Sequence, residues 1–312
     1  MKRALLLVLP IVGLLAADPV QPPVGGNVNT EKVTFRMQFT VTATPGLDQT
    51  TLTILVPKTV PQRQKVVSLT YSKPPSEEFD ADGNHYARFT MDNPPARTVI
   101  TIDGQAEAYR FDLNTVKTVN PPNLANAQDL QMWLADEKYL EKNAPPIQTA
   151  AQSITGSDDI TELRNIMAFV TKTLRESGFS SADRGALWAI QNKNGDCTEF
   201  AELFVALCRA KNIPARYCEG YLVGLVPANQ PSAHNWAEAY TKQYGWVRFD
   251  PIHTRDRTAT FDSCKPEYLQ LSNIRHDNGL NDSHYYHWTW QGSGNVRVDS
   301  HFTVTHRETA AK

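Results

Sequence analysis

Alternating apolar and polar positions dominate the first third of the chain. From Val33 to Val41 every second residue is apolar, with threonine, arginine and glutamine between them. A period of two indicates a strand with one buried face. The alternation recurs in four further stretches, which are Leu52 to Val56, Ala87 to Met91, Val99 to Ile102 and Ala106 to Phe111. Short strands at this spacing predict a small antiparallel β-sandwich over roughly residues 25–115.

Turn residues separate these predicted strands. Asp82-Gly83-Asn84 precedes the third stretch, and Asp103-Gly104 lies between the last two. Dipeptides of aspartate and glycine are typical of tight turns. We therefore expect a turn at each place, and we expect the sandwich to fold separately and to supply no catalytic residue.

Helical spacing replaces the alternation after Pro121-Pro122, which we interpret as a linker. Apolar residues at helical intervals follow Asp158-Asp159 as far as Leu174 and predict a capped amphipathic helix. An earlier helix is predicted from Ala125 to about Leu140, ending before Pro145-Pro146. Strands are predicted again from Tyr285 to Trp290 and from Val296 to Val304. Helices followed by strands indicate an α+β domain, preceded by the all-β sandwich.

The first residues have the order of a secretory signal peptide. Met1-Lys2-Arg3 is basic, Ala4 to Leu15 is apolar, and Ala16-Ala17 is a pair of small residues. The apolar run is shorter than the roughly 20 residues that span a bilayer. We therefore expect export to the periplasm or the medium without stable membrane insertion. The expected division is a leader over 1–17, a sandwich domain over 18–117 and a catalytic domain over 118–312.

Charge narrows the range of partners. Acidic and basic side chains nearly cancel, with a formal net charge of -2, and no dense basic run occurs. Nucleic acid is therefore not an expected partner. A peptide or protein substrate is expected instead, and the oligomeric state stays open.

Thiol chemistry is indicated by three segments in the second half. They are Gly195-Asp196-Cys197, His234-Asn235-Trp236-Ala237-Glu238 and Gly245-Trp246-Val247-Arg248-Phe249-Asp250-Pro251. A cysteine nucleophile needs a base that takes its proton, and the base needs a third group that holds its tautomer. Cys197, His234 and Asp250 suit these roles in chain order.

Local pattern brings the three residues together. An amphipathic helix is predicted from Asp196, which places Cys197 in its first turn, where unpaired N–H groups favour a thiolate. Two strands follow, Ala215 to Val223 and Ala233 to Tyr240, and a third runs from Val247 to Asp250. Neighbouring elements of this kind present their side chains to one cleft.

Over roughly residues 125–295 the chain resembles the transglutaminase-like superfamily of papain-type thiol enzymes. Besides the three segments above, the matching stretches are Arg184-Gly185-Ala186-Leu187, Ala206-Leu207-Cys208-Arg209-Ala210, Ile213-Pro214-Ala215-Arg216-Tyr217 and Gly220-Tyr221. Two departures are Asn212 and Ile252, where the family usually has glycine and threonine. Asparagine tolerates a left-handed turn, so Asn212 can still end the helix. The resemblance implies a helix with the nucleophile packed on an antiparallel sheet, and a Cys197–His234–Asp250 triad.

Some nearby residues have several interpretations. Gln191 is a candidate oxyanion donor, although the Cys197 backbone N–H needs no side chain for that role. Trp236 and Trp246 are candidate cleft walls or core aromatics. Arg216 and Glu238 are interpreted as structural.

The other cysteines and the C-terminal histidines need no special chemistry. Cys208 lies about 16 Å from Cys197 along one predicted helix, too far for a disulfide, and is interpreted as a core residue. Cys218 and Cys264 are the one pair left open as a disulfide. His276, Asp277, His284 and His287 contain ligand types for zinc, but His284 and His287 face opposite sides of a strand, so no metal and no cofactor are expected.

Three functions fit this sequence. In the first, an exported peptidase or amidase forms an acyl-enzyme that water releases. In the second, a lysine amine replaces water, as in a cross-linking transglutaminase. Animal transglutaminases carry a calcium-binding region and two C-terminal barrels that this sequence lacks, so hydrolysis is favoured. In the third, the fold is a non-catalytic envelope binding module.

Overall fold

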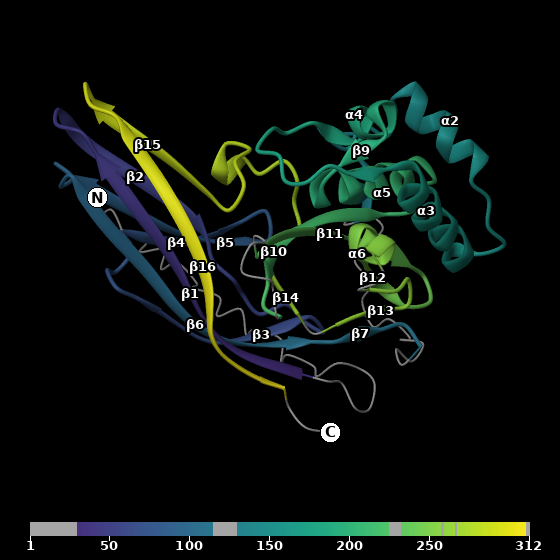
Figure 1. The fold of residues 1–312 in the computed structure, drawn as a ribbon, viewed down its shortest axis with the longest axis horizontal. Coiled ribbons are helices and arrows are strands. Elements are labelled where there is room, and N and C mark those ends of the chain that lie inside the picture. The colour runs from purple at the N-terminus through teal and green to yellow at the C-terminus, as the bar shows by residue number, and fades with distance from the viewer. Residues whose placement is uncertain (1–29, 115–129, 225–231, 257–258, 266, 310–312) are drawn as a thin grey trace, which may run out of the picture.

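The computed structural model describes residues 30–114, 130–224, 232–256, 259–265 and 267–309 (Figure 1). The expected leader, the Pro121-Pro122 linker and the start of the helix predicted at Ala125 lie outside these residues. Within the described ranges, no helix is both long enough and apolar enough to cross a bilayer.

Two four-stranded antiparallel sheets form the sandwich. Their strands are β1 (Thr30–Ala43), β2 (Leu47–Leu55), β3 (Gln64–Tyr71), β4 (Glu77–Ala81), β5 (Asn84–Asp92), β6 (Arg97–Tyr109), β15 (Tyr286–Gly292) and β16 (Val296–Thr309). The strand orders are β16-β1-β6-β3 and β15-β2-β5-β4. The predicted alternation is confirmed in β1, where Phe35, Met37 and Phe39 are buried and their neighbours are not.

Of the two predicted turns, only the first forms. Asp82 and Gly83 have positive φ and connect β4 to β5. Asp103-Gly104 instead lies inside β6, so the turn predicted there is wrong. The ring of Phe35 lies directly over Gly104, and a Cβ at this position would come within 2.2 Å of the ring. The glycine is therefore required for cross-strand packing and not for a turn.

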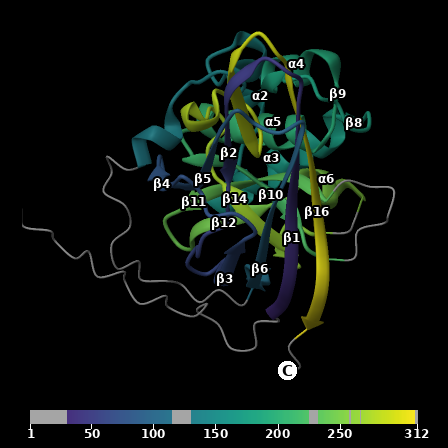
Figure 2. The same cartoon turned by 90° about the vertical axis from the view of Figure 1, so that its left-hand side faces the viewer.

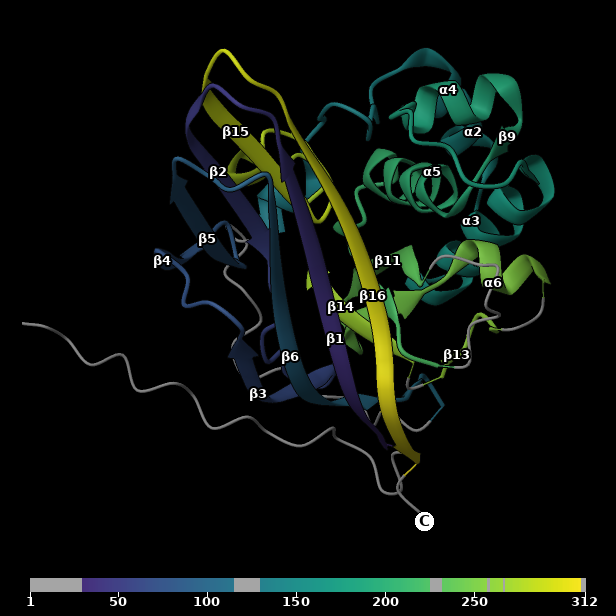
Figure 3. The same cartoon turned by 60° about the vertical axis from the view of Figure 1, so that its left-hand side comes forward.

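The sandwich is completed by strands from the far end of the chain. β16 pairs with β1 from Val296↔Ala43 to Thr309↔Glu31, and β15 pairs with β2 (Figure 3). Both strands fall in the predicted 118–312 domain. Strand pairing departs from that division, because one edge of β1 and one edge of β2 are paired with these C-terminal strands.

A third four-stranded antiparallel sheet carries the helical part of the molecule. Its order is β12-β11-β10-β14, with β10 (Ala215–Leu222), β11 (Ala233–Thr241), β12 (Gly245–Phe249) and β14 (Tyr268–Ser272). Two short pairs join β7 (Phe111–Asp112) to β13 (Ser263–Cys264) and β8 (Arg175–Glu176) to β9 (Asn194–Gly195). The helices are η1 (Met132–Leu134), α2 (Pro145–Ser153), α3 (Asp159–Thr173), α4 (Gly185–Asn192), α5 (Cys197–Ala210), α6 (Pro251–Asp256) and η2 (Asn278–Leu280).

Helix α5 is the centre of this half. It packs on β10 and β11 and is surrounded by α2, α3 and α4 (Figure 1). The view onto the sandwich shows the helices behind its strands (Figure 2). The α+β class, with helices on an antiparallel sheet after β-sheets, is confirmed. The end predicted for the earlier helix, at about Leu140, is wrong. The chain turns at η1, and Leu140 forms an isolated β-bridge.

The two halves share their hydrophobic cores through β10 and the segment that follows it. Tyr217 packs in the core beneath α5, whereas Tyr221 and Val223 pack in the core of the sandwich. Arg63, which precedes β3, also reaches the β12-β11-β10-β14 sheet and donates to Glu238 at 2.5 Å. The expected separate folding of the sandwich is therefore not supported by the packing.

Deletion of residues 30–114 tests this coupling. The deletion removes the partners of β15 and β16, exposes Tyr221 and Val223, and leaves Glu238 without Arg63. We expect an insoluble or unfolded product, measured by soluble yield and near-UV circular dichroism. A soluble, cooperatively unfolding product would contradict the shared core.

Candidate active site

Cys197 begins α5. Its N-cap is Asp196, whose side chain accepts from Thr198 N, while the Glu199 side chain accepts from Asp196 N, which completes a capping box. This arrangement confirms the helix start predicted from the sequence. Cys197 is partly exposed, whereas Phe200 and Phe204 on the same helix are fully buried. The helix therefore holds the thiol at the edge of the core.

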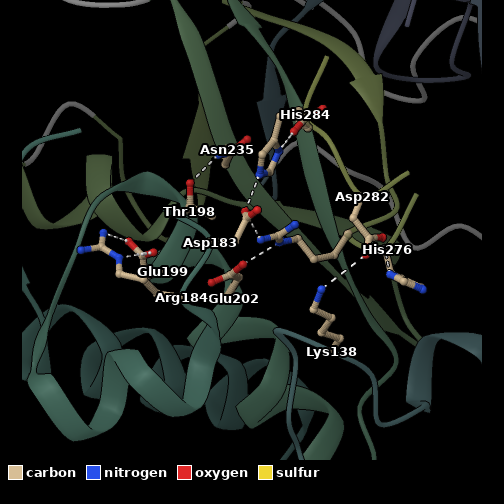
Figure 4. Close-up of polar contacts among 12 residues, drawn as sticks. Lys138, Asp183, Arg184, Thr198, Glu199, Glu202, Asn235, His276, Asp282 and His284 are labelled. Carbon is tan, nitrogen blue, oxygen red and sulfur yellow. Dashed lines mark hydrogen bonds and ion pairs between the residues drawn. The ribbon is translucent and has the colours of Figure 1, made fainter. Parts of the chain in front are cut away.

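The strand opposite the thiol carries His234 and Asn235. The Asn235 amide donates to Thr198 Oγ1 at 2.8 Å and lies 3.8 Å from Cys197 Sγ. Figure 4 shows this contact between the strand and the first turn of α5. The amide thus links β11 to the nucleophile position, and it places the residue next to His234 against the sulfur.

His234 is held by Asp250. His234 Nε2 lies 2.7 Å from Asp250 Oδ2, and both side chains are buried. Asp250 follows β12 directly, at the residue where the chain turns into α6. Because the carboxylate occupies Nε2, Nδ1 is the ring nitrogen left to act on a thiol.

Asp250 receives further donors. Tyr268 donates its hydroxyl to Oδ2 at 2.6 Å, and the His253 backbone N–H donates to Oδ1 at 3.1 Å. Burial alone would raise the pKa of Asp250, but the charges of His234 and His253 lower it well below its usual range. Asp250 is therefore an ionised carboxylate in hydrogen-bond contact with the His234 ring.

The thiol itself is not pre-ionised. Burial, followed by the charge of Asp196, raises the pKa of Cys197 to about 12, and a backbone hydrogen bond from Asn235 only partly opposes this. The helix N-terminus, which favours a thiolate, is therefore opposed at Cys197 by burial and by neighbouring acids. Burial makes the largest contribution and the nearby acids add to it, so this thiol needs a base to take its proton.

The structure separates the residues that the sequence grouped around the site. Gln191 is exposed on α4 and forms no hydrogen bond among the described residues, so its oxyanion role stays a prediction. Trp236 is fully buried against Tyr268 and is a core aromatic. Trp246 packs against Trp133, with the Arg216 guanidinium 4.1 Å from its ring centroid.

Glu238 and Arg216 are structural, as their positions in strands indicated. Arg216 Nη2 lies 2.5 Å from Glu238 Oε2, and Arg63 approaches the other carboxylate oxygen. All three side chains lie in the interior or at its edge, and none contacts Cys197, His234 or Asp250 among the described hydrogen bonds and ion pairs.

The remaining cysteines are buried and free. Cys208, Cys218 and Cys264 are each fully buried, and none forms a disulfide. The pair left open by the sequence, Cys218 with Cys264, is therefore two separate thiols. Burial raises the pKa of Cys264 to about 12.

The C-terminal histidines are dispersed into different contacts. Asp277 accepts from Tyr86 and Asn84, His287 Nδ1 lies 3.3 Å from Ser283 Oγ, and His276 pairs with Asp282. These side chains do not converge on one point. Among the described residues, the three possible metal ligands that do gather are His234, Asp250 and His253.

His284 belongs to a charged network that fastens α5 to the sandwich (Figure 4). It lies between Glu219 and Asp183, with Nε2 3.0 Å from Asp183 Oδ1. Arg275 joins Asp183 at 2.7 Å to Glu202 of α5 at 2.6 Å. Burial would lower the pKa of His284, but its acidic partners raise it to about 10, so the ring is cationic at neutral pH.

Two residues of the site were not predicted from the sequence. His253 lies three positions after Asp250, a spacing that brings side chains together at the start of a helix, so the signal was present. Tyr268 comes from β14, whose pairing with β10 has no local signature.

The comparisons with known proteins agree with this architecture. Residues 148–251, which include Cys197, His234 and Asp250, match the model of the transglutaminase-like superfamily. Over this core the chain is similar to the transglutaminase-like superfamily.

Particular relatives resemble longer parts of the chain. A candidate cysteine protease of Cytophaga hutchinsonii has the same fold, with a TM-score of 0.61 and 21% sequence identity over 90% of this chain and 92% of that chain. Uncharacterised proteins of Mycobacterium tuberculosis and Mycobacterium bovis are 26% identical over 225 residues, which are 61% of this chain and 69% of theirs.

Proposed function

We propose that the protein is a thiol-dependent amide-bond hydrolase, a peptidase or amidase, that works through an acyl-enzyme on Cys197. The observation that carries the proposal is the pair of His234 and Asp250, 2.7 Å apart, in which His234 precedes Asn235, the residue of β11 whose amide lies 3.8 Å from the Cys197 thiol. The superfamily and the candidate protease with the same fold support thiol chemistry at this place.

The first half of the reaction cleaves the amide. His234 Nδ1 takes the proton from Cys197 Sγ as the sulfur attacks the substrate carbonyl carbon. Asp250 stabilises the imidazolium that results. The carbon–nitrogen bond then breaks, and the same proton passes from His234 to the leaving amine. The thioester that remains joins the acyl group to Cys197.

The second half releases the acid. Water gives a proton to His234 as its oxygen attacks the thioester, and the carbon–sulfur bond breaks. The proton returns to Cys197 Sγ, so the enzyme is regenerated. The Cys197 backbone N–H, at the first position of α5, has no intrahelical partner and is the candidate donor to an oxyanion formed at this sulfur.

Selective alkylation tests the nucleophile. We expect iodoacetamide at neutral pH to label Cys197 before the other three thiols, because it alone is partly exposed whereas the others are fully buried. Peptide mapping after short exposure measures the order of labelling. Preferential labelling of Cys208 or Cys264 would overturn the assignment of Cys197.

The fate of the acyl group separates the functions. A peptide amide substrate incubated with and without a lysine-like amine reports hydrolysis as free acid and transfer as an amine conjugate. Free acid as the main product in both mixtures supports the hydrolase. A dominant conjugate would instead identify a cross-linking transglutaminase, and turnover of neither kind with an alkylatable Cys197 would favour the binding module.

Export is part of the proposal. The basic, apolar and small-residue order of residues 1–17 supports a periplasmic or secreted location. Fractionation of a cell that expresses the full chain, with N-terminal sequencing of the product, tests it. Recovery in the cytoplasm with an intact N-terminus would contradict export.

A further inference from the structure

His253 lies against both members of the proposed base pair. Its Nδ1 is 2.9 Å from Asp250 Oδ2, the same oxygen that accepts from His234 Nε2. Its ring stacks on the His234 ring, with centroids 4.5 Å apart and planes 15° from parallel. One carboxylate oxygen therefore serves two parallel imidazoles.

The position of His253 is fixed by its own backbone. Asp250 Oδ1 accepts from the His253 backbone N–H at 3.1 Å, and Thr254 N donates to the Asp250 carbonyl at 2.9 Å. The Asp250 side chain is thus held at one oxygen by the backbone of α6 and at the other by the His253 and Tyr268 side chains. Rotation of the carboxylate away from His234 breaks several of these contacts together.

Ring orientation matters because the base must present one particular nitrogen. If His234 carries its proton on Nε2, Nδ1 is unprotonated and is able to receive the thiol proton. A carboxylate that rotates freely permits the other tautomer, in which Nδ1 is protonated and cannot act as a base. The raised pKa of Cys197 makes this loss serious, because the thiol does not ionise unaided at neutral pH.

We propose that His253 is a positioning residue for the thiol chemistry, holding Asp250 by its Nδ1–H donor so that His234 keeps the Nε2–H tautomer. The inference rests on the proposed function and assigns it a fourth residue. His253 acts through Asp250 and His234 and does not itself touch the substrate.

The same three side chains have the composition of a metal site, since their ligand atoms lie within 4.8 Å of one another. The stacked rings argue for the hydrogen-bonded arrangement instead. In nearly parallel imidazoles the in-plane lone pairs run side by side, whereas a bound ion requires them to converge on one point.

Three substitutions separate the donor from the ring. His253→Asn keeps a nitrogen donor at the δ position without the imidazole, His253→Phe keeps a stacking ring without the donor, and His253→Ala removes both. Arg255→Ala is the matched control on α6, since Arg255 lies over the Phe200 ring and not against Asp250. Thermal unfolding of each variant reports any general loss of stability.

The two measurements need no substrate. The first is the ¹⁵N chemical shifts of His234 in the histidine-labelled full chain, assigned with a His234→Gln variant, which report the tautomer. The second is the rate at which iodoacetamide alkylates Cys197 at neutral pH. We expect the wild type, His253→Asn and Arg255→Ala to show the Nε2–H tautomer and similar rates. His253→Phe and His253→Ala are expected to show mixed tautomers and rates lower by roughly 10-fold.

Each other outcome has a definite meaning. An unchanged His234 tautomer and an unchanged alkylation rate in His253→Ala would overturn the positioning role. Equal losses of alkylation rate in the Asn, Phe and Ala variants of His253, together with lowered thermal stability, would also overturn it. Dependence of wild-type alkylation on an added divalent metal, lost on chelation, would also overturn it in favour of a metal site. A wild type in which Cys197 is not the reactive thiol would instead defeat the proposed function itself.

Discussion

Replacement of His234 by alanine is expected to reduce turnover of an amide substrate by at least about 1000-fold, because the base moves a proton in every step. Asp250→Asn is expected to leave a larger remnant, since the carboxylate orients the base and does not itself exchange protons. The loss is severe because the resting Cys197 thiol holds its proton: its pKa is raised to about 12, so a neighbour must take the proton.

The double variant sharpens this expectation. His234→Ala combined with Asp250→Asn should be no slower than His234→Ala alone, because Asp250 acts only through the ring it contacts at 2.7 Å. The measurement is kcat for the two single variants and the double variant, with circular dichroism to establish folding. Arg297→Ala, at an exposed surface pair with Asp299, is the matched control. Retention of most activity in His234→Ala would disprove the triad.

Local signals in the sequence were sufficient for the elements that carry the site. Asp196 and Glu199 specify the capping box that starts α5, and Asn212 has the left-handed conformation expected after it. Alternation defined β1, and Pro251 follows the last residue of the triad. These features depend on neighbours within a few positions, where residue type and backbone geometry are directly coupled.

Long-range packing decided what the sequence could not. Nothing near Val296 indicates that its strand pairs with Ala43, because both edges have the same alternating pattern as any other sandwich strand. Asp103-Gly104 is a dipeptide typical of turns, but in the structure Gly104 leaves room for the Phe35 ring because it has no side chain. Such choices follow from which surfaces meet, and a one-dimensional pattern does not contain that information.

The pKa of the Cys197 thiol was the second feature that the sequence did not predict. A cysteine at a helix N-terminus is ordinarily expected to lose its proton more readily. Here the acids that cap α5, Asp196 and Glu199, lie beside the thiol and raise its pKa together with burial. The residues that start the helix therefore add to the effect of burial, which is the larger cause of the raised pKa. The sequence contained both acids, but only their placement and burial decided the sign of the net effect.

Glu238→Gln is expected to lower the free energy of unfolding by about 3–5 kcal/mol, the usual cost of breaking a buried ion pair on one side. Glu238 is fully buried between Arg63 and Arg216, at 2.5 Å from each, and lies 4.0 Å from Arg248. The three guanidinium nitrogens of Arg248 have no hydrogen-bond partner among the described residues, so the carboxylate is its nearby countercharge. Its loss leaves buried cations uncompensated and also loosens Arg63, which comes from the sandwich.

Urea unfolding at neutral pH measures this effect, with Arg297→Ala as the control that should stay near the wild type. The pH dependence gives a second reading. Burial would raise the pKa of Glu238, but Arg63, Arg216 and Arg248 hold it well below its usual range. A carboxyl whose folded pKa is lowered contributes stability above its unfolded pKa of about 4.3 and loses it as the pH falls toward the folded value. The wild type should therefore lose its advantage over Glu238→Gln only in acid below that pH. A difference below about 1 kcal/mol at neutral pH would show that the cluster does not join the two halves energetically.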